Sequence, residues 1–315
     1  MKEYLIKRLL LTIPVLFGVS VLVFSVIHLA PGDPAVIMLG PLATKESIEK
    51  IHQDLGLDKP LVVQYFSWIF KVVQLDFGRS VVLGREVFPE IWLRFKATAI
   101  LTVASLFLAV ILGVMAGITS AVRQYSLFDA LSMLGALAGV SMPVFFTGIV
   151  LIILFAMTWN LLPSAGMYSP AGGNAWDLLK HLILPALTLG TSSAAVLARM
   201  TRSAMLETVR QDYIRTARSK GLSERVVIYV HALRNAAITI ITVLGMQVGY
   251  LLGGAILTET VFSWPGVGMM MVRAIQVRDY PMVQGGVLFV AMVFVFVNII
   301  VDVAYALLDP RIRYR

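Results

Sequence analysis

The 315-residue chain is 58% hydrophobic and only 14% charged, which excludes an ordinary soluble domain, where about a quarter of residues are charged. Several uncharged apolar runs reach the roughly 20 residues that cross a bilayer core of about 30 Å. The formal net charge of +8 lies beside these runs, so membrane topology explains it better than nucleic-acid binding, and the absence of cysteine excludes disulfides and thiolate metal sites.

Six membrane spans are predicted in chain order. They are Leu9–Leu29, Thr98–Val122, Leu131–Met157, Leu182–Ala198, Ala236–Thr258 and Val283–Leu308. The fourth is short, contains Pro185 and is rich in small residues, which favours packing against protein rather than lipid. The first apolar run is too long for a signal peptide, and no small-x-small cleavage site precedes Pro31, so a retained anchor is predicted.

The distribution of lysine and arginine predicts the orientation of the spans. With the N-terminus inside, the segments 1–8, 123–130, 199–234 and 309–315 are inside and hold most of the basic residues. The short outer loops, 158–181 and 259–282, hold only Lys180, Arg273 and Arg278. Because short inner loops carry an excess of basic residues, both termini are expected inside.

The longest segment outside the spans is 30–97, predicted to be external. It opens with the helix-stopping turn Pro31-Gly32-Asp33-Pro34, and a helix is expected over Thr44–Leu55 with Thr44 as its N-cap. A second helix is expected over Leu61–Leu75. One of its faces is apolar, made of Val62, Phe66, Ile69, Phe70 and Val73. The segment is interpreted as a water-facing cap whose apolar stripe rests on the membrane domain, and the alternative is a docking surface for a soluble partner.

The chain lacks a motif for energy conversion. It has neither the G-x-x-x-x-G-K-[ST] loop that binds nucleotide phosphates nor the H-E-x-x-H metal motif. Only Asp302 and His28 are ionisable within the spans, and a structural role for Asp302 near the inner interface is favoured over a proton relay. The chain's histidines (His28, His52, His181 and His231) are too scattered to form a metal site. If the protein moves a solute uphill, another subunit must supply the work.

The basic loop Arg199–Arg234 is the strongest functional candidate. Within Ser203–Lys220, apolar positions recur at spacings of three, four and four, which predicts one helical face formed by Leu206, Val209, Tyr213 and Ala217. Gly221 permits a break, and the Ser223 hydroxyl is expected to cap a second short helix, Glu224–Leu233. Two helices at a fixed angle suit a protein cleft, and the alternative is a basic helix lying on anionic lipid.

This loop resembles the cytoplasmic loop of ATP-binding-cassette (ABC) importer permeases, in particular the dipeptide, oligopeptide, glutathione and nickel group. The resemblance rests on Asp212–Leu222 followed by His231–Ala236. Arg215 stands where the general family pattern has Glu, and Thr216 replaces its first Ala, so a salt bridge attributed to that Glu lacks its carboxylate here. Further matches run along the chain: Pro31–Pro34, Leu55–Pro60, Asp76–Gly78, Leu184–Gly190, Arg199–Ser203, Thr258–Gly268, Asp279–Pro281 and Asp309–Arg313.

The resemblance implies an all-α integral membrane fold of the six-span type I importer permease, with both termini cytoplasmic and paired coupling helices. It divides the chain into an anchor and first span (1–29), an external segment (30–97), a five-span core (98–308) and a cytoplasmic tail (309–315). The coupling loop is 199–234 and the external loop is 259–282. ATPase coupling is thereby assigned to Leu206, Val209, Asp212, Tyr213, Arg215, Thr216, Ala217, Arg218, Gly221, His231 and Arg234.

A second site is expected in the external loop. Trp264-Pro265-Gly266 predicts a sharp reversal, followed by a short helix over Gly268–Val277. The resemblance implies an external gate or pore mouth formed by Glu259, Phe262, Trp264, Pro265, Gly266 and Met271. Trp264 could instead be an interfacial aromatic anchor. Binding-protein docking is assigned to Glu46 and Glu49 in the long external segment.

Glycines at four-residue spacing predict close helix approach in two spans. These are Gly113 and Gly117 in one and Gly245, Gly249 and Gly253 in another. Contact with a second permease and packing within one subunit are both left open.

The resemblance implies a non-catalytic permease subunit in a bacterial inner membrane that forms half of a path for a small peptide-like solute. Its partners would be a second, similar permease, two cytoplasmic ATPases that bind ATP and Mg, and an external solute-binding protein. No cofactor in this chain, no metal and no nucleic acid is expected. The alternative, a self-contained ion-coupled transporter, would show inverted repeats and paired midplane charges, and the sequence shows neither. The substrate, and whether the permease pair is a homodimer or a heterodimer, stay open.

Overall fold

The computed structural model describes residues 2–29, 36, 44–46, 48–49, 52, 58–170 and 172–308. Across this part of the chain the regular structure is helical, with one isolated bridge between Arg79 and Glu86. The chain forms two compact units. One is built mainly from Ala97–Pro265 together with the chain from Val297 onward, and the other from Lys2–Lys96 and Gly266–Phe296.

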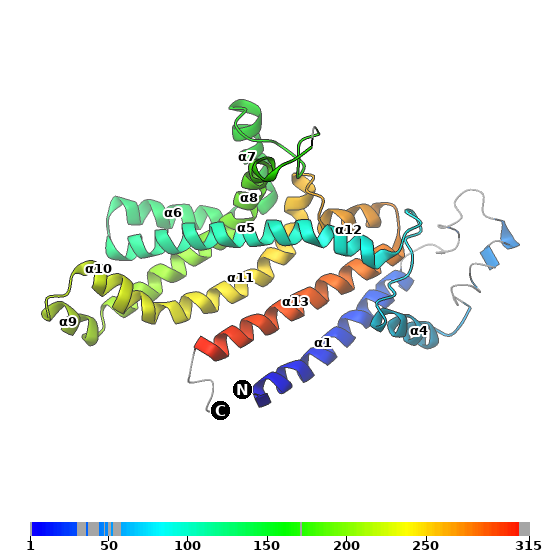
Figure 1. Cartoon of the computed structure of the whole chain (residues 1–315), viewed down its shortest axis with the longest axis horizontal. Coiled ribbons are helices and arrows are strands. Elements are labelled where there is room, and N and C mark those ends of the chain that lie inside the picture. The colour runs from blue at the N-terminus through cyan, green and yellow to red at the C-terminus, as the bar shows by residue number, and fades with distance from the viewer. Residues whose placement is uncertain are drawn as a thin grey trace. The chain divides into compact units, whose positions relative to one another are not determined.

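The first unit is organised around one long helix, α8 (Ala175–Val209), shown in Figure 1. It packs against α6 (Leu127–Ser141), α7 (Val144–Leu151) and α11 (Leu233–Val261). In the most apolar stretch of α8, 67% of the stretch is buried inside the protein. The corresponding share is 17–28% in the other three long apolar helices. This confirms the prediction that the small-residue span packs against protein. Pro185 lies inside α8 without ending it.

Close contact between α5 (Val87–Val122) and α8 depends on two glycines. A Cβ at Gly113 would lie 2.6 Å from the Ala194 carbonyl oxygen, and one at Gly117 would lie 2.6 Å from the Ala198 carbonyl oxygen. No real Cβ tolerates such distances, so these glycines allow α5 to approach the α8 backbone. Packing within one subunit therefore explains this part of the glycine pattern, whereas a Cβ at Gly253 would meet nothing within 4 Å.

The third predicted span is not one continuous helix. α6 and the segment Val144–Thr158, which comprises α7 and the π-helical turn η2 (Ile152–Thr158), are bent by 111° relative to each other. The bend lies at Met142-Pro143, where Met142 is extended (φ −79°, ψ 130°). The proline ring disfavours helical geometry in the preceding residue, and its nitrogen donates no hydrogen bond, so the predicted span Leu131–Met157 is bent at this point.

Membrane-spanning capacity is clear for most of the predicted spans. Four helices in the described part of the chain are long and apolar enough to cross a membrane, and the bent pair would make a fifth. They are α5, α8, the run Glu224–Val261 and α13 (Tyr280–Leu308). The first predicted span lies in α1 (Lys2–Leu29), of which the apolar stretch Leu10–Ser25 is shorter.

The second unit contains α1, α4 (Leu61–Val73), α12 (Val267–Gln276) and most of α13. Its core brings together residues distant in sequence, including Val87, Ile91, Met271 and Met282. α4 packs on α1 through Tyr65, whose hydroxyl lies 2.7 Å from the Ser20 hydroxyl. The predicted apolar face of α4 points elsewhere: Val62, Phe66, Phe70 and Val73 are exposed, so the expectation that this stripe rests on the membrane domain is wrong for these residues.

Some predictions lie outside the described residues. These are the turn Pro31–Pro34, the tail 309–315 and much of the helix expected over Thr44–Leu55. Within that helix the described positions Lys45, Glu46, Ile48, Glu49 and His52 are helical, and Glu46 and Glu49 are exposed.

Candidate functional site

The loop between α8 and α11 begins with a helix break that the sequence pattern did not predict. α8 continues to Val209, Arg210 ends it, and Gln211 is extended (φ −72°, ψ 150°) before α9 (Asp212–Ser219) begins. The expected single helix Ser203–Lys220 is therefore wrong. Leu206 and Val209 belong to α8, whereas Tyr213 and Ala217 belong to α9, so these four residues do not share one helical face.

The face with which α9 packs differs from the predicted one by one position. Ile214 is fully buried and Ala217 is 7% exposed, whereas Tyr213 is 41% exposed. Ile214 and Ala217 join a hydrophobic cluster with Met205 of α8 and Val227 of the following segment. Buried apolar contacts thus attach α9 to the ends of its neighbouring helices.

Gly221 marks the reversal after α9, as predicted. Its φ of +75° lies in the left-handed region, which residues with a Cβ adopt at a cost. Its N–H donates to the Arg218 carbonyl at 2.9 Å, so it closes the helix end. Across this turn, the Arg218 guanidinium donates to both carboxylate oxygens of Glu224, at 2.8 and 3.3 Å.

The second short helix is not a separate element. α10 (Glu224–Val226) runs through the π-helical η3 (Val227–Ala232) into α11, forming one apolar helical run over Glu224–Val261. Ser223 occupies the N-cap position, but its side chain makes no capping hydrogen bond, so the expected hydroxyl cap is wrong. The turn at Gly221 therefore leads from α9 into one continuous helical run that includes α11.

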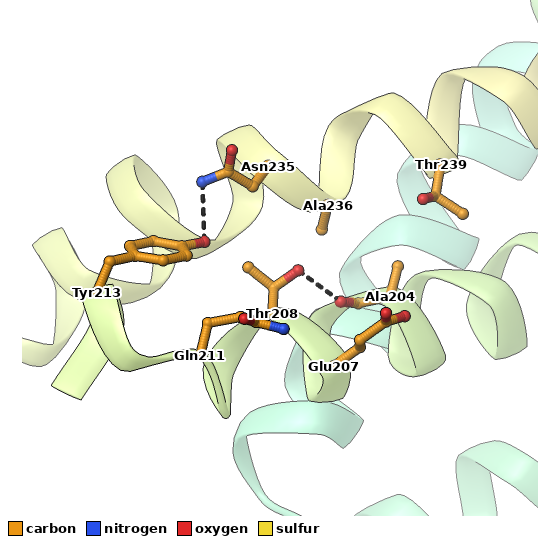
Figure 2. Close-up of a pocket in the computed structure, with 8 residues that line it drawn as sticks. All are labelled: Ala204, Glu207, Thr208, Gln211, Tyr213, Asn235, Ala236 and Thr239. Carbon is orange, nitrogen blue, oxygen red and sulfur yellow. Dashed lines mark hydrogen bonds between the residues drawn. The ribbon is translucent and has the colours of Figure 1, made fainter.

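A pocket of about 310 Å³ opens between the end of α8, α9 and the start of α11. Figure 2 shows its lining residues: Ala204, Glu207, Thr208, Gln211, Tyr213, Asn235, Ala236 and Thr239. The Asn235 amide donates to the Tyr213 hydroxyl at 2.8 Å and joins α9 to α11 across one side of the pocket. The Tyr213–Asn235 hydrogen bond therefore links α9 to α11 at the edge of this pocket.

The surface of this loop is basic and exposed. Its exposed cations are Arg199, Arg210, Arg215, Arg218, Lys220, Arg225 and Arg234. Arg215, which replaces the family's Glu, is only 4.0 Å from Asp212, and both side chains are highly exposed (85% and 99%). Such a pair adds little to stability, so the charges are accessible to a partner. Thr216 donates its hydroxyl proton to the Asp212 carbonyl within α9, and His231 is half-buried in η3.

Three of the predicted gate residues are buried at the C-terminal end of α11. Glu259, Phe262 and Trp264 are each at most 1% exposed. The Trp264 indole donates to the Ala97 carbonyl at 2.9 Å, and the Thr98 hydroxyl donates to the Glu259 carboxylate at 2.6 Å. The alternative of Trp264 as an interfacial anchor is wrong, because its ring is fully buried.

The remaining gate residues follow a reversal. The chain turns at Ser263, which has a φ of +49°, before Pro265 and Gly266 lead into α12. α12 confirms the predicted short helix to within one residue at each end. Met271 is buried in the core of the second unit.

One ion pair with a buried carboxylate was not predicted from the sequence. Arg202 of α8 donates to both carboxylate oxygens of Asp129 in α6, at 2.6 and 2.7 Å, and the Asp129 side chain is 5% exposed. Ser126 caps α6 by accepting from the Asp129 N–H. The Ser126-x-x-Asp129 spacing could have signalled the helix start, but no local pattern pairs Asp129 with a residue 73 positions away.

Comparison with known families covers nearly the whole chain. Residues 109–314 match the family described as the binding-protein-dependent transport system inner membrane component, and residues 1–102 match the N-terminal part of such membrane components. The chain belongs to this permease family. It is a multi-pass inner-membrane permease subunit of an ABC importer, and it is not itself catalytic. Because the chain belongs to this family, the alternative of a self-contained ion-coupled transporter is wrong.

Curated relatives align over the full length of both chains. A dipeptide transport system permease protein of Alkalihalophilus pseudofirmus is 46% identical to this permease. A di/tripeptide transport system permease protein of Pseudomonas aeruginosa is 45% identical, and a glutathione transport system permease protein of Escherichia coli is 46% identical. Among solved structures, a chain of the inward-facing methionine ABC transporter matches with a TM-score of 0.54 at 15% identity, covering 71% of this permease and 96% of that chain. That likeness supports the fold alone.

Proposed function

We propose that this permease imports a short peptide or a peptide-like solute of the size of glutathione. The support is full-length identity of 45–46% to permeases of dipeptide, di/tripeptide and glutathione systems. A peptide-like solute is therefore favoured over a metal ion as the substrate.

The proposed topology has six spans with both termini in the cytoplasm. The six proposed spans are the four long apolar helices α5, α8, α11 and α13, together with α1 and the bent α6–α7 pair. With this orientation, the basic loop between α8 and α11 is cytoplasmic and the residues around Trp264 are external. The proposed external gate consists of Glu259, Phe262, Trp264, Pro265 and Gly266, with Met271 at the pore mouth.

The proposed coupling element is α9 with the turn at Gly221. ATP and Mg would be bound by two partner ATPases, and a second permease would complete the translocation path. The single observation that carries this assignment is that α9 packs through Ile214 and Ala217 into a hydrophobic cluster shared with α8, η3 and α11, while its basic face is exposed. A partner that pulls on the exposed face would move α9, α10 and α11 together. The residues proposed to serve ATPase coupling are Leu206, Val209, Asp212, Tyr213, Arg215, Thr216, Ala217, Arg218, Gly221, His231 and Arg234. Of these, the buried Ala217 acts by packing within the permease rather than by touching the ATPase.

Substitution of Gly221 tests this mechanism. A Cβ there would meet no atom within 4 Å, so a new side chain acts through the backbone alone. Gly221→Val should strain the turn by about 1–3 kcal/mol. We expect ATP hydrolysis without substrate uptake in the reconstituted importer. The matched control is Gly221→Asn, since asparagine tolerates the left-handed conformation and should keep uptake near the unsubstituted level. Normal uptake by Gly221→Val at equal membrane abundance would refute the lever.

A further inference from the structure

α4 presents an apolar stripe that the rest of the chain leaves exposed. Val62, Phe66, Phe70 and Val73 are 65%, 59%, 67% and 76% exposed. Their spacing of four, four and three residues places them along one side of the helix. Burial of large apolar side chains is favourable, so a stripe of this kind indicates contact with an apolar medium or partner.

The other two sides of α4 show how the helix is oriented. One side packs on protein: Tyr65 and Val72 are buried, and the Tyr65 ring lies edge-on to Phe24 of α1 with the ring centroids 5.5 Å apart. The third side carries Gln64 and Lys71, with Ser67 between them at helical spacing. Apolar and polar stripes on different sides are typical of a helix that lies in the plane of a membrane interface.

The contact between α4 and α1 places α4 at membrane depth. Figure 1 shows α4 beside the C-terminal part of α1. Ser20, which contacts Tyr65, precedes Ser25, where the apolar stretch of α1 ends, by five positions, or about 8 Å at the helical rise of about 1.5 Å per residue. An interfacial helix buries its apolar face about 5–10 Å into the boundary between headgroups and acyl chains. This step rests on the proposed function, in which α1 is a membrane span.

The exposed apolar surface of α1 continues onto α4. Phe17 of α1 is 57% exposed, and its ring centroid lies 6.1 Å from that of Tyr65. The Tyr65 ring centroid in turn lies 5.4 Å from that of Phe66, which belongs to the exposed stripe of α4. Lipid that covers Phe17 would therefore also reach the α4 stripe. Continuity with the lipid-facing surface favours lipid over a soluble protein as the occupant.

We propose that α4 is an interfacial helix embedded in the leaflet that holds the C-terminal half of α1. The stripe Val62, Phe66, Phe70 and Val73 contacts acyl chains, and Lys71 reaches toward the lipid phosphates. α4 thereby anchors the segment between the first two spans to the membrane surface. This replaces the expectation of a water-facing cap.

Cysteine substitution tests the proposal directly, because the chain contains no cysteine of its own. The full-length protein, in vesicles of phosphatidylethanolamine and phosphatidylglycerol, would carry one cysteine labelled with an environment-sensitive fluorophore. The stripe variants are Phe66→Cys and Phe70→Cys, the matched polar-side variants are Ser67→Cys and Lys71→Cys, and Leu22→Cys on α1 is the lipid-facing reference. We expect brominated acyl chains to quench the stripe variants and the reference several-fold more than the polar-side variants. A water-soluble thiol reagent should show the opposite order.

The outcomes separate this proposal from the proposed function. Quenching of Leu22→Cys without quenching of Phe66→Cys or Phe70→Cys would overturn the interfacial helix and leave the α1 span intact. Absence of quenching at Leu22→Cys would instead refute the α1 span itself. Protection of the stripe variants only after addition of the solute-binding protein would show that a protein covers the stripe, and would overturn lipid contact.

Discussion

At the scale of single residues, the Asp129–Arg202 pair stands out because its charges are largely withdrawn from water. Two short charge-assisted hydrogen bonds compensate Asp129 for its burial and join α6 to α8. The Arg218–Glu224 pair has the same bidentate form but is 42% and 61% exposed. The two pairs should therefore differ in their effect on stability.

We expect Asp129→Ala to lower the unfolding free energy of the detergent-solubilised protein by about 2 kcal/mol, because the Arg202 guanidinium would lose its partner in a poorly hydrated site. Glu224→Ala, the exposed control, should cost less than about 1 kcal/mol. Thermal unfolding of both variants and of the double variant Asp129→Ala/Arg202→Ala checks this. Equal losses for the buried and exposed pairs would contradict the argument, and the double variant should recover part of the Asp129→Ala loss.

Glycine contacts allow a second prediction at this scale. Gly113→Ala would place a methyl group 2.6 Å from the Ala194 carbonyl oxygen and force α5 away from α8. We expect a loss of about 1–3 kcal/mol, as for other overpacked interfaces. The control is Gly135→Ala in α6, where a Cβ meets nothing within 4 Å and better helix propensity should be neutral or stabilising. A thermal shift of equal size in both variants would show that helix propensity, not contact, decides the effect.

At the scale of elements, apolar runs predicted where the long helices lie but not where they bend or end. The pattern at Leu131–Met157 is continuously apolar, and only Pro143 signals the bend, which depends on the local conformation of Met142. α8 passes beyond Ala198 because apolar positions at Met205 and Leu206 continue to find buried contacts in the following loop. The break at Gln211 carries no proline or glycine, so tertiary packing of Ile214 decides it.

The link between α9 and α11 gives an element-scale prediction. Tyr213→Phe removes the hydroxyl that accepts from the Asn235 amide and should weaken the attachment of α9 by about 1 kcal/mol. In the reconstituted importer we expect less substrate uptake per ATP hydrolysed, with basal ATPase activity retained. Tyr229→Phe, which alters an exposed tyrosine of η3, is the matched control and should keep the coupling ratio. An unchanged ratio in Tyr213→Phe would show that apolar packing alone transmits the movement.

At the scale of the whole molecule, the sequence predicts the helical membrane class because composition alone requires it. Resemblance predicted the family, and the comparisons confirmed it. The residues expected to form the coupling site do gather around α8, α9 and α11, since they are close in sequence. Pairs such as Asp129 with Arg202 or Ser20 with Tyr65 could not be predicted, because they depend on the packing of distant helices rather than on any local period.

The last prediction concerns the whole importer and its solute-binding protein. Glu46 and Glu49 are exposed in a segment of interleaved charge, which suits a transient, salt-sensitive contact. Reversing both, in Glu46→Lys/Glu49→Lys, should weaken the stimulation of ATPase activity by the binding protein several-fold while basal activity is retained. Rising salt should reduce the difference from the unsubstituted importer, because screening acts on exposed charges. Glu86→Lys, an exposed reversal elsewhere between the first two spans, tests whether added positive charge alone has this effect. Stimulation that is unchanged in the double variant, or reduced equally by Glu86→Lys, would remove Glu46 and Glu49 from the docking surface.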